Sequence, residues 1–355
     1  MTKTVFITGG AGFIGSCVVR QWLDARPNWR LVVIDKMTYA AGAEALTSAR
    51  KNPRFSLIQA DIGDAETMAS TFAHHQPDAV IHLAAESHVD RSIAHSAAFI
   101  DSNIVGSYRL LEVCCGYWSQ LPAEQRAAFR FVHVSTDEVY GSADDGQSFT
   151  EDDAYAPNSP YAASKAASDH LVRAWHQTYG LPTITGHASN NYGPFQLPEK
   201  LIPLMIHNAV AGLPLPLYGD GLHARDWLHV EDHARALLLL LERGEVGASY
   251  GIGTGVARSN QTLLATLCAQ LDQQHPTGAP HARLIQHVRD RPGHDRRYAI
   301  NPAKIQAELG WSPQIPFEAG LQQTVQWYLA HPDWLNQRGN AEHQRWLARH
   351  YGDGD

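Results

Sequence analysis

The sequence predicts an α/β protein with a doubly wound parallel sheet and a smaller, more irregular C-terminal lobe. Short apolar runs alternate with segments of helical periodicity through the first 190 residues. These runs are apolar throughout, as expected for parallel strands that helices cover on both faces. After residue 190 the chain changes to connections rich in proline and glycine with short helices between them. Together these observations favour one large sheet domain followed by a lobe that closes over it.

The predicted elements follow one another in a regular order. Strands are expected over 3–9, 30–35, 55–62, 78–85, 129–136 and 183–188, where apolar runs end in polar residues or glycines. Helical spacing predicts helices between these strands over 13–23, 64–74, 97–119 and 161–179. Later helices are expected over 200–211, 230–242, 260–272 and 317–329. A polar, tryptophan-bearing tail follows over 331–355.

Charge and composition exclude several classes of function. The 355 residues carry a net charge of −8, so there is no basic field for nucleic acid or an anionic membrane. No apolar run approaches the length of about 18 residues that a membrane span needs. The four cysteines and twenty histidines show no metal-ligand spacing, so we expect buried free thiols and no metal site. These features predict a cytoplasmic protein without nucleic-acid or membrane partners.

A glycine-rich turn is the first candidate site. Gly9, Gly12 and Gly15 follow the first strand and open a helix at Phe13 and Ile14. Without side chains, such positions let the backbone approach a pyrophosphate that sits on the helix N-terminus. Asp35 ends the second strand about 20 residues later, where a carboxylate accepts hydrogen bonds from ribose hydroxyls and repels a 2′-phosphate. The pattern predicts NAD rather than NADP, although the neighbouring charge of Lys36 weakens that electrostatic argument.

A Tyr-x-x-x-Lys pair is the second candidate site. Tyr161 and Lys165 are four residues apart on a predicted helix, so both side chains lie on one face. We expect Lys165 and the nicotinamide cation to lower the pKa of the Tyr161 phenol and so make it a base. The alternative is a packed tyrosine with a surface lysine. Ser135 and Thr136, at the end of the fifth predicted strand, would supply a hydroxyl partner.

The glycine spacing and the Tyr161–Lys165 pair resemble the extended short-chain dehydrogenase/reductase superfamily, in its sugar-nucleotide branch. The resemblance implies a Rossmann-type fold with NAD-binding and catalytic residues in 1–190, a lobe over 191–330 that mainly binds substrate, and the tail. It also implies that the cofactor contacts, besides the turn glycines, Phe13, Ile14, Tyr161 and Lys165, are Asp35, Lys36, Thr38, Asp61, Ile62, Leu83, Ala84, Ala85, Ser87, Ser102 and Asn191. It further implies a homodimer through the helices at 97–119 and 161–179.

Two adjacent acids distinguish between branches of this superfamily. Asp137 and Glu138 follow Thr136 directly, and this chain resembles the nucleotide-sugar 4,6-dehydratases in carrying that pair. The sugar-nucleotide epimerases usually have small or neutral residues there. Eliminating water from a hexose requires a base at C5 and an acid at O6, and two carboxyl groups with separated pKa values supply both. The alternative interpretation is a solvated loop.

The resemblance to the 4,6-dehydratases continues through the second half of the chain. It implies diphosphate, sugar and base contacts by Ser87, Thr136, Asn190, Glu199, Lys200, Leu201, Pro216, Tyr218, Arg225, Asn260, Asp290, Arg291, His294 and Arg296. Arg forks suit a dianionic diphosphate in an acidic protein, whereas the alternative for Arg225 and Arg296 is surface ion pairing. The chain departs from the family at His187, where Asn or Arg is common, and at His223, where Gln is common.

The implied reaction is the NAD-dependent dehydration of dTDP-glucose to dTDP-4-keto-6-deoxyglucose, a hydro-lyase step of deoxysugar biosynthesis. It proceeds by oxidation at C4, elimination of water across C5 and C6, and return of hydride to C6. Three alternatives stay open: a 4,6-dehydratase of UDP-, CDP- or GDP-hexoses, a 4-epimerase or decarboxylase on the same scaffold, and a non-catalytic dinucleotide-binding protein. The third would require the loss of Tyr161 or Lys165, and both are present.

Overall fold

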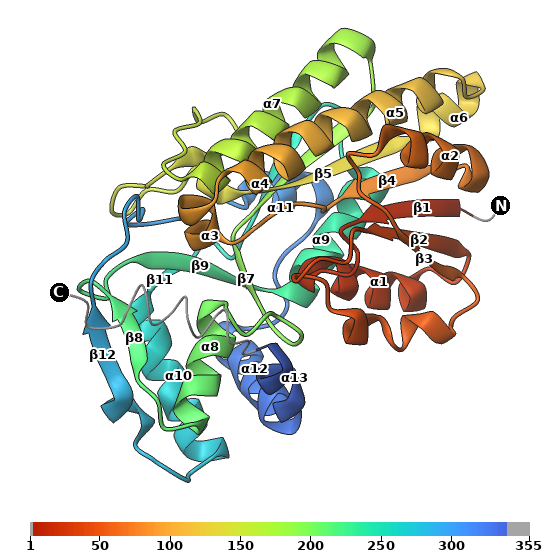
Figure 1. Ribbon diagram of the computed structural model, residues 1–355. Helices are drawn as coiled ribbons and strands as arrows, with labels where there is room; N and C mark the ends of the chain where they lie inside the picture. Colours follow the sequence, from red (N-terminus) through yellow and green to blue (C-terminus); the bar gives the residue numbers. More distant parts are fainter. Residues whose placement is uncertain (1–2, 339–355) are drawn as a thin grey trace.

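A seven-stranded, all-parallel sheet forms the centre of the computed structural model, which describes residues 3–338 (Figure 1). The strand order is β10-β6-β5-β4-β1-β2-β3, so the order reverses between β1 and β4 as in a doubly wound fold. The strands are β1 (Lys3–Thr8), β2 (Trp29–Asp35), β3 (Phe55–Gln59), β4 (Ala79–His82), β5 (Arg130–Thr136), β6 (Thr183–Ala188) and β10 (Ser249–Ile252). The predicted α/β class and parallel sheet are confirmed.

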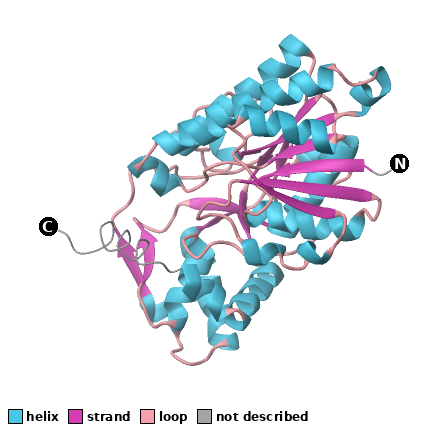
Figure 2. Cartoon of the chain, turned by 45° about the vertical axis from the view of Figure 1, so that its right-hand side comes forward, coloured by secondary structure: helices cyan, strands magenta, loops and turns pink. Residues whose placement is uncertain are grey.

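Helices cover both faces of this sheet and bury its apolar residues (Figures 1 and 2). One face packs against α1 (Phe13–Ala25) and α9 (Val230–Arg243), and the Trp22 indole of α1 donates a 3.2 Å hydrogen bond to the Ala234 carbonyl of α9. The other face packs against α2 (Ala65–His75), α5 (Ser107–Ser119) and α7 (Pro160–Tyr179). Covering both faces explains why the strands are apolar throughout.

The segment predicted as one helix over 97–119 is divided in the structure. It consists of α4 (Ala97–Phe99), a π-helical stretch η3 (Ile100–Gly106) and α5. The buried Asn103 amide of η3 donates to the Glu86 carbonyl and to Ser164 on α7, and its oxygen accepts from the Glu86 backbone N–H. Widened turns of this kind are frequent at functional sites. The wider turn places Ser102 against the main cavity.

The smaller lobe has its own apolar core, formed mainly by three helices: α8 (Leu201–Val210), α10 (Asn260–Gln274) and α12 (Phe317–Ala330). A parallel pair, β8 (Leu215–Tyr218) with β12 (Ile285–Val288), lies at its outer side. A three-stranded sheet combines β7 (Asn190–Tyr192), β9 (Ala224–His229) and β11 (Ala257–Ser259). Because β7 directly follows β6, this small sheet connects the lobe to the main domain.

Three elements after residue 190 belong to the main domain rather than to the lobe. Helix α9 packs on α1, β10 pairs with β6 at the edge of the sheet, and α11 (Ala303–Leu309) packs on β10 and α9. The chain therefore leaves the lobe for the sheet twice, at α9 with β10 and again at α11.

The remaining short elements are η1 (Ala43–Leu46), η2 (Ala49–Lys51), α3 (Val89–Ala94), α6 (Ala123–Ala128), η4 (Asp137–Tyr140), η5 (His281–Leu284) and α13 (Pro332–Arg338).

The structure also bears on the predicted cysteines and on the predicted C-terminal tail. All four cysteines are free thiols, with Cys17, Cys114 and Cys268 buried and Cys115 half-buried, as predicted. Of the predicted tail, α13 lies within the described chain, and 339–355 lies outside it. Over residues 3–338, none of the helices combines the length and apolar character needed to cross a membrane.

Candidate active site

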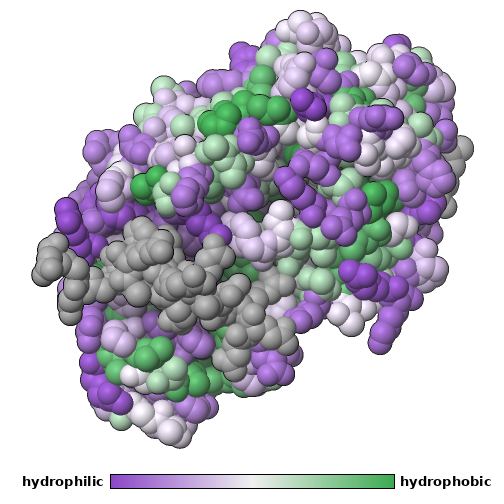
Figure 3. Space-filling view, in the orientation of Figure 1, coloured by the Kyte–Doolittle hydropathy of each residue, from purple (hydrophilic) through white to green (hydrophobic). Residues whose placement is uncertain are grey.

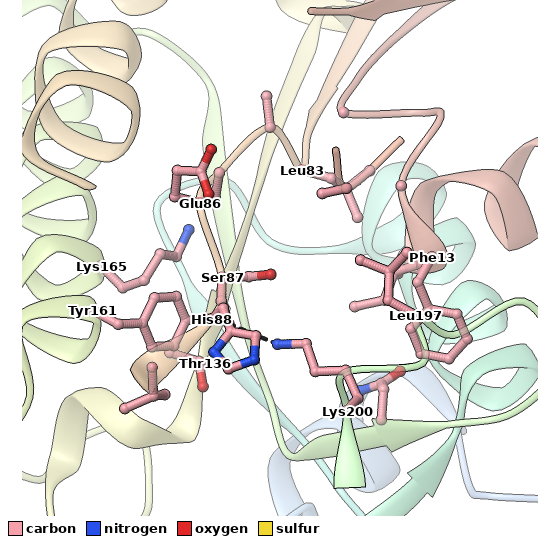
Figure 4. A pocket seen from close by; sticks show the side chains of 18 of the residues that line it. Phe13, Leu83, Glu86, Ser87, His88, Thr136, Tyr161, Lys165, Leu197 and Lys200 are labelled. Carbon is pink, nitrogen blue, oxygen red and sulfur yellow. Dashed lines mark hydrogen bonds between the residues drawn. The ribbon is translucent and has the colours of Figure 1, made fainter. Parts of the chain in front are cut away.

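A cavity of about 1070 Å³ lies between the carboxyl ends of the sheet strands and the smaller lobe (Figure 4). Parallel sheets of this topology place ligands at this edge, where the strand order reverses. Gly9, Asp35 and Thr136 reach the cavity from strand ends or the turns after them. Pro216, Asn260 and Arg291 reach it from the lobe. Both parts of the chain therefore build one site.

The glycine-rich turn forms one wall, and its geometry requires glycine. Gly9 has φ 68°, and a Cβ there would lie 2.7 Å from the Ala84 Cα. A Cβ at Gly15 would overlap the Gly9 carbonyl. The N-terminus of α1, at Phe13 and Ile14, faces the cavity. This arrangement suits the pyrophosphate of a dinucleotide.

Asp35 and its neighbours form the adjoining wall. The Asp35 carboxylate accepts hydrogen bonds from the backbone N–H groups of Ala11 (2.9 Å) and Met37 (2.8 Å). Lys36, whose charge weakened the argument for NAD, forms a 2.7 Å ion pair with Asp61. Asp35 therefore faces the cavity beside a lysine whose charge is already paired. The acidic end of β2 fits an unphosphorylated ribose.

Tyr161 and Lys165 project from α7 into the cavity as predicted (Figure 4). The Lys165 ammonium is buried and donates a 2.8 Å hydrogen bond to the Val134 carbonyl, and burial lowers its pKa to about 8. Burial and the Glu138 carboxylate raise the pKa of Tyr161, while a hydrogen bond with Thr136 opposes the rise. In the protein without cofactor the pKa of Tyr161 is therefore above its usual value, and its lowering by Lys165 together with the nicotinamide cation stays a prediction for the loaded site.

Asp137 and Glu138 occupy different environments although they are adjacent. Both are buried on η4, which excludes the interpretation as a solvated loop. Burial, the Glu138 carboxylate and Asp226 raise the pKa of Asp137 well above its usual range, and among the described residues its Oδ2 has no hydrogen-bond partner. Burial also raises the pKa of Glu138, but Arg291, Arg225 and Lys200 oppose that rise. The pair therefore favours a protonated Asp137 beside an ionised Glu138.

Glu138 lines the cavity, whereas Asp137 does not. Thr136 connects the two environments, because it lines the cavity and its hydroxyl lies 3.5 Å from Asp137 Oδ1. The side chain of Asp137 lies next to the cavity wall rather than on it.

A buried hydrogen-bond network beneath α7 explains why a histidine stands at position 187. The Asp169 carboxylate accepts hydrogen bonds from Ser135 (2.8 Å) and Tyr155 (3.1 Å), and it lies 2.9 Å and 3.1 Å from His133 and His187 Nε2. Although burial alone would raise it, the pKa of Asp169 is held well below its usual range by the two histidines. His187 is thus a structural partner of the carboxylate one helical turn after Lys165.

The lobe supplies cations and amides to the cavity. Arg225, Arg291 and Lys200 line it, and Lys200 donates a 2.9 Å hydrogen bond to the Ser87 carbonyl across the two lobes (Figure 4). Asn190 and Asn260 each have a buried side-chain oxygen without a partner among the described residues. The other predicted residues that line the cavity are Gly12, Thr38, Asp61, Ile62, Leu83, Ala84, Ala85, Ser87, Ser102, Asn191, Glu199, Leu201, Pro216, Tyr218 and His294.

Two further predicted substrate residues lie outside the cavity lining. Arg296 forms a bidentate ion pair of 2.7 Å and 2.9 Å with Asp220, and both side chains are about half exposed. This position matches the alternative of surface ion pairing. Asp290 lies behind His294, whose Nδ1 is 2.6 Å from its carboxylate. Arg296 and Asp290, like Asp137, match the family's sequence pattern but do not line the cavity.

One group in the described chain brings together three side chains of metal-ligand type, His223, Asp290 and His294. The two imidazole rings stack at 3.8 Å and 9°, and both contact the one carboxylate. Parallel stacked rings direct their nitrogen lone pairs side by side rather than toward one point. His223 therefore stacks on His294, and His294 lines the cavity.

Several cavity residues were missed from the sequence. Tyr298 lines the cavity and directly follows the polar run 290–297. Its position next to that run was the one feature of the sequence that could have indicated a role in the site. His233 on α9 lines the cavity and contacts Asn191 at 3.0 Å, although its helix packs on the sheet. Neither residue belongs to a recognisable motif.

Together, the fold and the site define a nucleotide-sugar enzyme of the extended short-chain dehydrogenase/reductase type. Residues 6–324 match the family model described as GDP-mannose 4,6 dehydratase. The chain is 52% identical over 356 residues to the dTDP-glucose 4,6-dehydratase of Shigella flexneri, with 98% of each chain covered. It is 54% identical over 337 residues to that of Neisseria meningitidis serogroup B, covering 94% of this chain and 95% of the relative.

A solved structure supports the same family. The dTDP-glucose 4,6-dehydratase DesIV of Streptomyces venezuelae, crystallised with NAD, has a TM-score of 0.86 and 43% identity, covering 94% of this chain and 99% of its own. The chain belongs to the dTDP-glucose 4,6-dehydratase family.

Proposed function

We propose that this protein is an NAD-dependent dTDP-glucose 4,6-dehydratase, a hydro-lyase that forms dTDP-4-keto-6-deoxyglucose. The observation that carries the proposal is the buried acid pair. Asp137 and Glu138 lie beside Tyr161 with unequal surroundings, so the cavity offers a base and a phenol, and an acid lies directly behind its wall. The relatives from Shigella flexneri and Neisseria meningitidis, both dTDP-glucose 4,6-dehydratases, support this substrate.

In the proposed mechanism Tyr161 accepts the proton of the hexose 4-OH. The glycine turn and Asp35 would hold NAD, whose chemistry would be to take a hydride from C4 and later to return it to C6. Lys165 is buried in the cavity lining, and its positive charge stabilises the phenolate form of Tyr161, which becomes the neutral phenol when it accepts this proton. Thr136 hydrogen-bonds Tyr161 and holds the phenol in position. Oxidation at C4 makes the C5 hydrogen acidic.

Elimination then needs one group to remove a proton and another to supply one. Glu138, which three cationic side chains keep closer to the ionised form, removes the C5 proton. Asp137, which burial keeps protonated, supplies the proton on which the 6-OH leaves as water, with Thr136 between it and the cavity. Glu138 later returns its proton to C5.

The diphosphate requires positive charge inside an acidic protein. Arg225, Arg291 and Lys200 provide three cations along the lobe side of the cavity, close enough to Glu138 to oppose the rise of its pKa that burial causes. Arg291 is held by a 2.6 Å ion pair with Asp90, so substrate would share or replace that partner. Asn190 and Asn260 present oxygens that can accept hydrogen bonds from substrate hydroxyls or amides.

A panel of nucleotide sugars tests the proposal. The purified protein is incubated separately with dTDP-, UDP-, CDP- and GDP-glucose, and the masses of the products are measured by mass spectrometry. We expect loss of one water from dTDP-glucose, at a rate well above the other three. An isomer of unchanged mass would indicate a 4-epimerase, and faster dehydration of another nucleotide would reassign the base.

We further propose that the protein acts as a homodimer in the cytoplasm. Free cysteines suit a reducing compartment. The contact surface in this proposal is the outer face of η3, α5 and α7, where Ile100, Tyr108 and Tyr179 are each more than two-fifths exposed.

A further inference from the structure

Tyr298 is a buried titratable group in the cavity that the proposed mechanism does not use. It lines the cavity, is nearly inaccessible to solvent, and presents its hydroxyl to two carboxyl groups. The hydroxyl lies 2.8 Å from Asp295 Oδ2 and 3.4 Å from Glu138 Oε2. The second oxygen of Asp295 is occupied, because it accepts a 2.6 Å hydrogen bond from the Asn158 amide.

The surroundings fix this tyrosine in place. The Arg225 guanidinium lies over its ring at 4.1 Å, and the same guanidinium donates a 3.0 Å hydrogen bond to the Asp295 carbonyl. The Tyr298 backbone N–H donates to the Ala224 carbonyl at the start of β9. The hydroxyl can therefore rotate about its C–O bond, but the ring cannot leave the carboxyl groups.

The hydroxyl carries one hydrogen for two acceptors. Burial, and then the Glu138 carboxylate, raise the pKa of Tyr298 far above its ordinary value, so the phenol stays protonated. An ionised Glu138 requires a donor, and Tyr298 serves as one when its hydrogen points to Glu138. A protonated Glu138 requires an acceptor, and Tyr298 serves as one when its hydrogen points to Asp295.

We propose, on the basis of the proposed function, that Tyr298 is a positioning residue whose rotating hydroxyl serves Glu138 both before and after it takes the C5 proton. When the C5–H bond breaks, its proton forms an O–H bond on Glu138 and its electron pair forms the C5–C6 double bond as C6 loses its oxygen. Tyr298 neither gains nor loses a proton. Its hydrogen turns from Glu138 to Asp295, and Glu138 then donates to the phenol oxygen.

The test compares two steps within one turnover. Holoenzyme and dTDP-glucose are mixed rapidly, and the rise of NADH absorbance reports oxidation at C4. Incorporation of solvent deuterium at C5 reports proton transfer by Glu138. In Tyr298→Phe we expect the absorbance rise to change less than about threefold, and deuterium incorporation to slow on the order of 10- to 100-fold, as for loss of a hydrogen bond to a charged group.

A second background separates positioning from a general structural effect. In Glu138→Gln, the further change Tyr298→Phe should leave the residual deuterium incorporation unaltered, because the phenol acts through Glu138. A matched control is Tyr250→Phe, since Tyr250 is also buried and its hydroxyl bonds Glu308 at 2.8 Å away from the cavity. We expect both steps to be unchanged in that control.

Asp295→Asn tests the same arrangement if Tyr298→Phe does not fold. With Asn158 donating to the amide oxygen, the new NH₂ group faces Tyr298, so the phenol hydrogen is confined to Glu138 and proton removal slows. The proposal is overturned if Tyr298→Phe incorporates deuterium at the wild-type rate. If only Asp295→Asn folds, the wild-type rate in that variant overturns it. Equal slowing of both steps, or a further loss in the Glu138→Gln background, also overturns it. If wild-type protein releases no water from dTDP-glucose, the proposed function fails instead.

Discussion

Neighbouring residues in one sequence motif receive different chemistry from their surroundings. Asp137 and Glu138 are adjacent, yet the three cations near Glu138 oppose the rise of its pKa, while Asp226 adds to that of Asp137. The sequence predicts the pair because the family pattern is local. The division of roles depends on Arg225, Lys200 and Arg291, which lie at least 62 residues later in the chain. That part of the site becomes visible only in three dimensions.

Two arginines of the predicted substrate set provide a matched comparison. Arg225 is buried and lines the cavity, whereas Arg296 is paired with Asp220 at the surface. Replacing each by lysine keeps the charge and removes the planar fork. We expect Arg225→Lys to raise KM for dTDP-glucose on the order of 10- to 100-fold, as for loss of charge-assisted hydrogen bonds, and Arg296→Lys to change it less than about threefold. Steady-state kinetics measure KM in both variants. Equal increases in KM would show that Arg296 contacts the substrate.

A buried histidine predicts how stability depends on pH. Burial lowers the pKa of His233 from 6.5 to about 3, so the folded protein keeps this imidazole neutral while the unfolded chain protonates it. The unfolded state then binds more protons, and stability falls as pH drops below about 6.5 toward 3. Between pH 6.5 and 5 the loss from this group is about 2 kcal/mol.

Urea unfolding at pH 6.5 and pH 5 measures that loss in the wild type and in His233→Gln. The variant should lose about 2 kcal/mol less over this interval than the wild type. An identical pH dependence of the two proteins would show that His233 is not held neutral.

At the scale of elements, the turn between β1 and α1 predicts retention of cofactor. Alanine at Gly9 would need a positive φ and would place its Cβ 2.7 Å from the Ala84 Cα, so the turn must move. Wild-type protein, purified without added cofactor, should release NAD(H) on denaturation, and Gly9→Ala should release much less. Gly116→Ala on α5, where a Cβ meets nothing within 4 Å, should retain it fully. NADP(H) in the wild-type supernatant would contradict the role given to Asp35.

The helices were predicted well where periodicity is strong and local. The expected helix over 161–179 corresponds to α7 at Pro160–Tyr179, where Ser159 caps the first turn and Gly180 ends the last. Helix α9 similarly follows the expected 230–242. The π-helical stretch η3 was not predicted, because its cause is the contact of Asn103 with Glu86 and Ser164 rather than a local pattern.

The short strands of the lobe were also outside the reach of sequence periodicity. The strands β7, β8, β11 and β12 have three or four residues each, which is too short for an alternating pattern. Their partners are distant, since β8 pairs with β12 about 70 residues later. Their register is set by the tertiary fold.

At the scale of the whole molecule, the main domain is built from both halves of the chain. The expected division at residue 190 follows the change in composition, yet α9 and β10 return to the sheet. This return ties the lobe to the sheet at several points and brings His233, on α9, to the cavity beside Asn191. Composition alone does not reveal it, because helices of the lobe and helices of the sheet both bury apolar residues in a core.

The outer helices of the main domain predict the oligomeric state. Apolar side chains gather over α5 and α7 in the upper part of the space-filling view (Figure 3). Tyr108, which belongs to α5, is 42% exposed. In the proposed homodimer a charge at this position would be buried, so Tyr108→Glu should shift the protein toward monomer. Leu213→Glu in the lobe, at a residue that is 41% exposed, should leave the dimer intact. Light scattering at micromolar concentration decides, and a monomeric wild type would contradict the proposal.

The division of labour between Tyr161 and the acid pair is the central claim, and rapid-mixing absorbance with dTDP-glucose tests it most directly. Tyr161→Phe should show no rise of NADH absorbance, because the 4-OH keeps its proton. Glu138→Gln and Asp137→Asn should show the rise at nearly the wild-type rate, followed by a decay and product release slowed on the order of 10²- to 10⁴-fold, as for loss of a general acid or base. Equal failure of all three variants at the NADH rise would contradict the assignment of elimination to Asp137 and Glu138.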